Sequence, residues 1–164
     1  MKATCQHCGH TFDYPAHSTC PNCGDIEKRE KSDGKKFAHH KAGKRTIGGN
    51  EIYFPNQMEA NYYRYLHWMR EHGMIADFEY QPDYLDFTQY GFTHGTTRYR
   101  PDFKVTEKDG SSYYVETKGW LDAKSKTKLK RAREFCKVRV NLVLYREYKQ
   151  LEKQISGLVP EWER

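Results

Sequence analysis

Two acidic side chains and one lysine are the residues of this 164-residue chain whose types and spacing best suit chemistry: Asp102, Glu116 and Lys118. Two carboxylates that approach each other repel unless a cation neutralises them. Mg²⁺ typically binds through one or two carboxylates plus water and phosphate oxygens. A lysine beside them can stabilise negative charge or polarise an attacking water. The pattern predicts a Mg²⁺ or Mn²⁺ site, and the alternative is an exposed hairpin in which Glu116 simply pairs with Lys118.

Whether the two carboxylates meet depends on how two predicted strands pair. Strands are predicted over 98–105 and 112–117, and the residues Lys-Asp-Gly at 108–110 mark a turn between them. A two-residue turn would put Asp102 and Glu116 on opposite faces of the sheet, because side chains alternate along a strand.

A three-residue loop gives the other register, and we expect this loop. It places Gly110 at the third position, where such loops need a positive φ. Glu107 then pairs with Ser111, and Asp102 lies opposite Glu116 with Cβ atoms about 5 Å apart.

The remaining elements place this hairpin in a mixed sheet covered by helices, an α/β (α+β) class. A helix is predicted from 57 to 72, between Asn56 and the helix-ending Gly73. The other predicted elements are extended segments at 77–82 and 84–87, a basic helix at 124–137, a strand at 138–145 and a closing helix at 147–155. The order helix, strands, helix, strand indicates a mixed sheet flanked by helices.

Four of the five cysteines form two C-x2-C pairs separated by eleven residues: Cys5, Cys8, Cys20 and Cys23. Two such turns supply a tetrahedral site for one structural Zn²⁺. Disulfides are an alternative, but no export signal is visible at the N-terminus. A thioredoxin-like redox pair would need a βαβ pattern, and none surrounds either pair. We therefore predict a zinc ribbon over 1–28 that binds DNA or a protein partner.

The segment 29–50 is predicted to be a basic linker ahead of the main domain at 51–164. From Lys28 to Arg45, eight residues are Lys or Arg and two are acidic. The segment is either a solvated connector or an arm that lies along phosphates through Lys44 and Arg45.

The net charge of +6 favours a polyanionic partner, and nucleic acid is the commonest one. The predicted basic helix carries Lys124, Lys128 and Arg131 as one stripe, which favours phosphate contact over a merely solvated surface. Arg100 is expected to serve similarly. No apolar stretch approaches the roughly 18–20 residues that span a bilayer, so we expect no membrane partner and a cytoplasmic location.

Four short motifs in this order resemble the PD-(D/E)XK nuclease superfamily and, more narrowly, small phage-borne nucleases of that type. The motifs are Glu59-Ala60, Gln81-Pro82, Tyr99-Arg100-Pro101-Asp102-Phe103 and Val115-Glu116-Thr117-Lys118-Gly119. The resemblance extends from Tyr53 to Arg133, so the ribbon and the linker lie outside it.

The resemblance implies a restriction-endonuclease-like fold and metal-dependent hydrolysis of DNA phosphodiesters, with branched DNA in phage DNA processing as one substrate. It implies that Asp102, Glu116 and the Thr117 carbonyl hold Mg²⁺, that Lys118 activates water, and that Glu59 contributes to the metal site. Glu59 also fits a capping box in which it reaches back to the N–H of the helix-capping asparagine. Many related nucleases pair to cut both strands, so a homodimer is an option. For a phage-encoded chain, the location would be the host cytoplasm.

Two other functions stay open on the sequence. One is a non-catalytic zinc-ribbon DNA-binding or adaptor protein with a nuclease-like fold. The other is an RNA-processing protein, which rests on the ribbon and the charge alone.

Overall fold

The computed structural model describes residues 2–4, 11–13 and 41–164 of the chain. The chain divides into two compact units, Met1–Ala38 and His39–Arg164. In the first unit, strand β1 (Lys2–Thr4) pairs antiparallel with β2 (Thr11–Asp13). The other elements that the structure describes belong to the second unit.

The second unit begins with a β-hairpin that replaces the end of the predicted linker. Strand β3 (Gly43–Ile47) pairs antiparallel with β4 (Asn50–Phe54) along the length of both strands. The Gly48-Gly49 turn has positive φ at both residues, which matches the twist of a two-residue hairpin. More and less exposed residues alternate along β3, and the apolar side chains of Ile47 and Phe54 at the strand ends are buried. The linker prediction is therefore wrong from Gly43 onward, because apolar side chains anchor this basic segment.

Helix α1 (Gln57–Glu71) confirms the helix predicted from residue 57. It begins because Asn56 Oδ1 accepts a hydrogen bond from the Glu59 backbone N–H at 2.9 Å. It ends at Glu71, two residues before Gly73, which adopts a φ of 61°. The helix buries a stripe of apolar side chains: Ala60, Tyr62, Tyr63 and Leu66.

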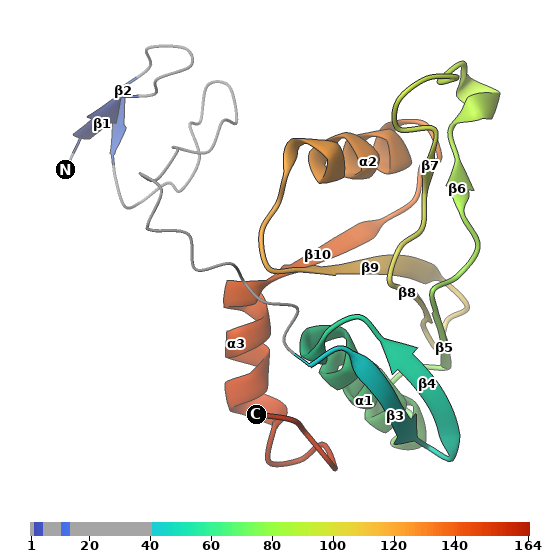
Figure 1. Ribbon diagram of the computed structural model, residues 1–164, viewed down its shortest axis with the longest axis vertical. Coiled ribbons are helices and arrows are strands. Elements are labelled where there is room, and N and C mark those ends of the chain that lie inside the picture. Colours follow the sequence, from blue (N-terminus) through green and yellow to red (C-terminus); the bar gives the residue numbers. More distant parts are fainter. Residues whose placement is uncertain (1, 5–10, 14–40) are drawn as a thin grey trace. The chain divides into compact units, whose positions relative to one another are not determined.

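A four-stranded mixed sheet forms the centre of the second unit (Figure 1). Its strands, in spatial order, are β10 (Val140–Leu144), β9 (Ser112–Lys118), β8 (Phe103–Thr106) and β5 (Asp77–Tyr80). The β10–β9 pair is parallel, and the other two pairs are antiparallel. The predicted fold class, a mixed sheet flanked by helices, is confirmed at this level.

A smaller two-stranded sheet stands beside the central one. It consists of β6 (Leu85–Asp86) and β7 (Arg98–Tyr99), with a short 3-10 helix, η1 (Thr88–Tyr90), in the loop between them. One continuous strand was predicted over 98–105, but β7 and β8 are separate strands. Pro101 lies between them, and proline has no N–H to donate to a ladder.

Helices α2 (Ala123–Glu134) and α3 (Tyr145–Ile155) complete the unit. In Figure 1, α2 lies on one side of β9 and β10, and α1 lies on the other. The packing agrees, because Val115 of β9 joins the core cluster with α1, whereas its neighbour Tyr114 packs against the cluster that contains Leu129 of α2. No helix in the part of the chain that the structure describes is long and apolar enough to cross a membrane.

The β8–β9 hairpin has the register that the three-residue loop predicts. The Glu107 N–H donates to the Ser111 carbonyl at 2.8 Å, and Phe103 pairs with Val115. Gly110 has a φ of 84°, as the third loop position requires. Extended by one residue, this register sets the residue before Phe103 opposite the residue after Val115, and these are the two predicted carboxylates.

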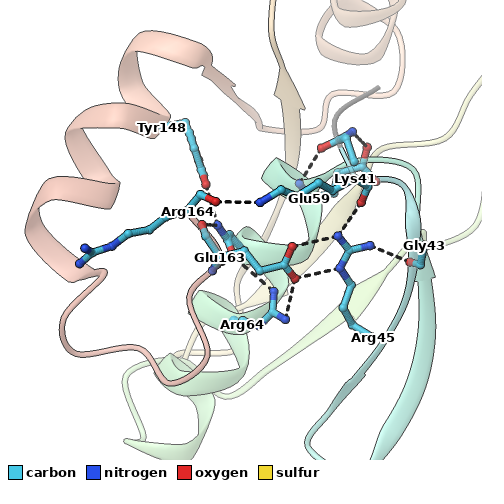
Figure 2. Close-up of polar contacts among 10 residues, drawn as sticks. Lys41, Gly43, Arg45, Glu59, Arg64, Tyr148, Glu163 and Arg164 are labelled. Atoms are coloured by element: carbon cyan, nitrogen blue, oxygen red, sulfur yellow. Dashed lines mark hydrogen bonds and ion pairs between the residues drawn. The ribbon is translucent and has the colours of Figure 1, made fainter. Parts of the chain in front are cut away.

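The C-terminal segment is held to α1 and to the hairpin through the side chain of Glu163 (Figure 2). Arg45 of β3 donates from Nε and Nη2 to the two carboxylate oxygens at 2.8 and 2.9 Å. Arg64 of α1 contributes a second guanidinium at 2.8 Å and exposes 7% of its side chain. Asn61 Nδ2 donates to the Glu163 carbonyl at 2.7 Å, and Asn61 Oδ1 accepts a hydrogen bond from the Glu163 N–H at 3.0 Å. The segment is therefore part of the fold of this unit.

We expect Glu163→Gln to lower the free energy of unfolding by about 3 kcal/mol, because it leaves two poorly solvated guanidinium groups without a countercharge. Hydrogen bonding from Arg45, with the charge of both arginines, lowers the pKa of Glu163. Its stabilising effect is therefore present at neutral pH and is lost as the pH falls through this lowered pKa. Urea unfolding at pH 7 and at pH 3 measures both effects.

The matched control is Glu161→Gln, a change at an exposed side chain two residues earlier, which should alter the unfolding free energy by less than about 0.5 kcal/mol. Equal losses in the two variants would mean that the ion pairs of Glu163 do not hold this segment.

Candidate active site

The structure brings Asp102 to the end of strand β9. Asp102 directly precedes β8, and its Oδ2 atom accepts hydrogen bonds from the Thr117 backbone N–H at 2.7 Å and from Thr117 Oγ1 at 2.8 Å. Within the described residues, Oδ1 of Asp102 takes no hydrogen bond. One carboxylate oxygen is thus fixed by β9, and the other remains available for a ligand.

Glu116 lies on the same strand end, held by two side chains. Tyr99 donates its hydroxyl to Glu116 Oε2 at 2.9 Å, and Lys118 Nζ lies 3.2 Å from Oε1. Glu116 is only 6% exposed. The contact with Lys118 is the one that an exposed hairpin would also contain, but this burial argues against a mere surface pair, because buried carboxylates are costly without a specific role or partner.

Glu59 approaches the same region from the start of α1. Its Oε2 atom accepts a hydrogen bond from the Tyr80 hydroxyl at 3.0 Å, and its Oε1 atom accepts one from Asn56 Nδ2 at 2.8 Å. The capping-box hypothesis is therefore right about the pair but wrong about one donor, which is the side-chain amide of Asn56 and not its backbone N–H. The buried carboxylate thus holds the side chain of the capping asparagine and lies within the electrostatic influence of Glu116.

Two of the three carboxylates, those of Asp102 and Glu59, have raised pKa values. Burial, followed by the charges of Glu116 and Glu59, holds the pKa of Asp102 well above its ordinary value. Burial also raises the pKa of Glu59, against the hydrogen bonds from Tyr80 and Asn56, and the Glu116 charge adds to the rise. The charges of Glu116 and Glu59 act on Asp102, and the charge of Glu116 acts on Glu59, so the three acids share one electrostatic environment.

Two tyrosine hydroxyls that the sequence analysis did not assign complete the site. Burial first, and then the adjacent carboxylates, raise the pKa values of Tyr80 and Tyr99. Both phenols therefore keep their protons and act as donors. Both stand in or beside quoted motifs, since Tyr80 precedes Gln81-Pro82 and Tyr99 opens the motif that contains Asp102. The periodicity of a sequence does not reveal which hydroxyl a carboxylate will meet.

The atoms that could bind a metal here are oxygens, which suit a hard divalent cation. Glu59, Asp102, Glu116 and the Thr117 carbonyl supply oxygen atoms, which Mg²⁺ and Mn²⁺ prefer. In the part of the chain that the structure describes, no group of three or more His, Cys, Asp or Glu side chains is already arranged around a metal position. Mg²⁺ needs fewer protein ligands than that, because water and phosphate oxygens fill its other positions.

The predicted phosphate-binding residues divide into engaged and available groups. Arg45 is committed to Glu163, and Arg131 donates to the Thr96 carbonyl and lies 3.9 Å from the Phe92 ring centroid. These two guanidinium groups hold the fold together, so we leave them out of the binding surface.

The other four residues that are expected to contact phosphate are closer to the solvent. Lys124 is exposed on α2, and Lys128 Nζ lies 5.7 Å from the ring centroid of Tyr99, whose hydroxyl holds the Glu116 carboxylate. Lys44 pairs with Glu51 at 2.7 Å, with both side chains largely exposed. Arg100 is exposed, but its guanidinium is engaged in the fold, because it donates to the carbonyls of the loop that follows β5. The predicted zinc ligands Cys5, Cys8, Cys20 and Cys23 lie outside the described residues.

We expect Asp102→Asn to raise the melting temperature at pH 8, in buffer without added divalent cations, by a few degrees, since about 1 kcal/mol shifts the melting temperature of a chain of this size by about 2–4 °C. The raised pKa of Asp102 means that ionisation disfavours the folded state, so the cost exists above that pKa and disappears as the pH falls towards about 4. Thermal scans from pH 5 to pH 8 should show the gap between variant and wild type growing with pH. Glu79→Gln, at an exposed carboxylate paired with Lys104, should give no such gain, and an equal gain there would contradict the argument.

Comparison with known proteins gives a family but no activity. Residues 38–154 match the model of a family described as "Protein of unknown function (DUF1064)". No curated protein matches the chain. The match contains Glu59, Asp102, Glu116 and Lys118, whereas Glu163 and the predicted zinc ligands lie outside it. Because the match covers well over half of the sequence, the chain belongs to the DUF1064 family.

Proposed function

We propose that this protein is a Mg²⁺-dependent deoxyribonuclease that hydrolyses phosphodiester bonds, and that its second unit is a restriction-endonuclease-like domain of the PD-(D/E)XK type. The observation that carries the proposal is the β8–β9 register, which sets Asp102 and Glu116 in one electrostatic environment with Lys118. The resemblance of the four motifs gives this arrangement its chemical interpretation.

Three side chains and one carbonyl are the proposed ligands of Mg²⁺ or Mn²⁺: Glu59, Asp102, Glu116 and Thr117. When the three carboxylates are ionised, the nearby ammonium of Lys118 offsets one of three negative charges, so an excess of two remains for a divalent ion. When bound, the ion would activate water and neutralise charge on the phosphate.

The remaining groups act by orientation and by charge. Tyr80 and Tyr99 fix one oxygen each of Glu59 and Glu116, and β9 fixes one oxygen of Asp102. The ammonium of Lys118 is within hydrogen-bonding reach of Glu116, so it can instead donate to an attacking water or to a charged phosphate oxygen at that position. Because these donors are already oriented in the folded chain, little reorganisation is needed on substrate binding.

The proposed DNA surface lies at the start of α2. Lys124 and Lys128 lie in the first half of α2, close in sequence to the end of β9. Hydrogen bonds from Ser125 lower the pKa of Asp122, which caps α2, and the charges of Lys118 and Lys128 lower it further. The ammonium groups of Lys118 and Lys128 thus act on a common region, where a phosphate backbone would be attracted.

Several further assignments are part of the proposal. The first unit would be a zinc ribbon with one structural Zn²⁺ that binds DNA or a protein. A homodimer would cut both strands, and a phage-encoded chain would work in the host cytoplasm. A non-catalytic DNA-binding or adaptor role and an RNA substrate are the alternatives that the following experiment separates.

We expect the purified protein to nick supercoiled plasmid in Mg²⁺ or Mn²⁺, and Asp102→Asn and Lys118→Ala to lower the rate by about 100-fold or more, the typical cost of losing one group that acts on developing charge. Gel assays with plasmid, branched DNA and RNA, at matched protein concentrations, measure the rates. Since Asp102→Asn should melt higher than wild type, its inactivity could not be ascribed to unfolding.

The matched control is Lys104→Ala, which removes an ammonium group from the neighbouring strand, where it pairs with Glu79. It should cut at nearly the wild-type rate. Equal cutting by wild type, Asp102→Asn and Lys118→Ala would eliminate this site. DNA binding without cleavage in either metal would favour the adaptor alternative, and cleavage of RNA alone would favour RNA processing.

We also expect Lys128→Gln to weaken DNA binding several-fold and to reduce the slope of log affinity against log salt by about one, the signature of one lost phosphate contact. Fluorescence anisotropy in Ca²⁺, at several salt concentrations, measures both quantities. Lys130→Gln is the control. Lys130 is exposed and lies near Glu134, and because it is two residues from Lys128 its side chain points to a different face of the helix. Identical slopes for both variants and wild type would place the DNA elsewhere.

A further inference from the structure

An exposed tyrosine stands on a tightly held loop beside the candidate active site. Tyr84 is 57% exposed and lies in the loop between β5 and β6. Large aromatic side chains usually bury most of their surface. An exposed ring on a fixed backbone is a better binding element than one on a mobile loop, because less conformational entropy is lost on binding.

The loop is fixed by contacts with the segment that carries Asp102. The Gln81 N–H donates to the Asp102 carbonyl at 2.7 Å. The Arg100 guanidinium donates to the Gln81 carbonyl at 2.9 Å and to the Pro82 carbonyl at 3.0 Å. Gln81 has a φ of 48°, unusual for a residue with a side chain, so these bonds hold the backbone in a conformation it would seldom adopt alone.

The same arginine also holds the ring. The Cζ atom of Arg100 lies 5.3 Å from the centroid of the Tyr84 ring, within the range of a cation–π contact. The ring is therefore oriented by a group that is itself bound to the loop. With more than half of its surface exposed, Tyr84 still has area for a second planar group.

The loop connects directly to the carboxylates. Gln81 Nε2 lies 3.3 Å from the Tyr80 hydroxyl, and that hydroxyl donates to Glu59. Only three residues separate Tyr80 from Tyr84 in the chain. A chain of that length spans at most about 14 Å, so a group stacked on Tyr84 would lie within reach of the site of the proposed hydrolysis.

We propose that Tyr84 stacks on an unpaired nucleobase beside the scissile phosphate, and that the substrates are DNAs with unpaired nucleotides there, such as flaps, gaps or junctions. The inference rests on the proposed function for its cleavage step, but the stacking itself is a binding event. In a continuous duplex, both faces of each base are covered by neighbouring bases, so the ring has no face to contact. Base–aromatic stacking contributes to the binding of single strands with little dependence on sequence.

The test compares Tyr84→Ala and Tyr84→Phe with wild type on two DNAs of the same length, a perfect duplex and the same duplex with a short single-stranded flap. Binding is measured in Ca²⁺ by fluorescence anisotropy, with 2-aminopurine in the flap to report stacking, and cleavage is measured separately in Mg²⁺. We expect Tyr84→Ala to weaken binding to the flap by about 5- to 100-fold and to change binding to the duplex less than about twofold. Tyr84→Phe, which keeps the ring, should bind the flap nearly as wild type does.

Tyr53→Ala is the matched control, because Tyr53 is similarly exposed, at 59%, on the hairpin. It should leave both affinities unchanged. Equal losses on flap and duplex, no loss on either, or no DNA binding at all would overturn the stacking inference. If flap binding depends on Tyr84 but no DNA is cleaved, the stacking inference stands and the nuclease proposal is contradicted. If flap binding and cleavage are the same in Tyr84→Ala as in wild type, the nuclease proposal stands and the stacking inference is contradicted.

Discussion

The pairing register of β8 and β9 is the constraint on which the site depends. A shift of one residue would turn every side chain of one strand to the other face, and Asp102 and Glu116 would then lie on opposite sides of the sheet. The hairpin loop prevents this shift, because Gly110 takes a φ of 84° that a residue with a side chain would adopt only with strain. The chemistry at one end of the strands is thus determined by a glycine at the other end.

That register has an energetic cost, which the surrounding donors offset in part. Three carboxylates close together in a poorly solvated place oppose ionisation, as the raised pKa values of Asp102 and Glu59 show. Each acid nevertheless receives a neutral hydroxyl donor: Thr117 for Asp102, Tyr80 for Glu59 and Tyr99 for Glu116. Hydroxyl donors orient a carboxylate without cancelling its charge. The arrangement therefore keeps negative potential available for a cation, which pairing with arginines would have removed.

Local signals in the sequence were sufficient for the elements that depend on local physics. The Asn56 cap, the helical stripe and Gly73 predict α1, and Gly110 predicts the register of the central hairpin. Local signals do not reveal a partner that lies far away along the chain. The surrounding lysines and arginines assign Arg45 to a basic linker, but its countercharge is Glu163, 118 residues later. Composition alone cannot distinguish a solvated arginine from one in a buried pair.

The hydroxyl donors of the site are also distant in sequence from the carboxylates they bind, so local signals do not identify them. Helix α1 connects the C-terminal segment with the site. Glu59 and Asn61 are two residues apart on α1, so they point in widely different directions around the helix. Asn61 binds the backbone of Glu163 and the Tyr148 hydroxyl, whereas Glu59 binds Tyr80. A rotation of α1 that moved Glu59 away from Tyr80 would also break the contacts of Asn61 and Arg64 with the C-terminal segment. The residues after the family match thus help to fix the rotation of α1 about its axis, and with it the direction in which Glu59 faces.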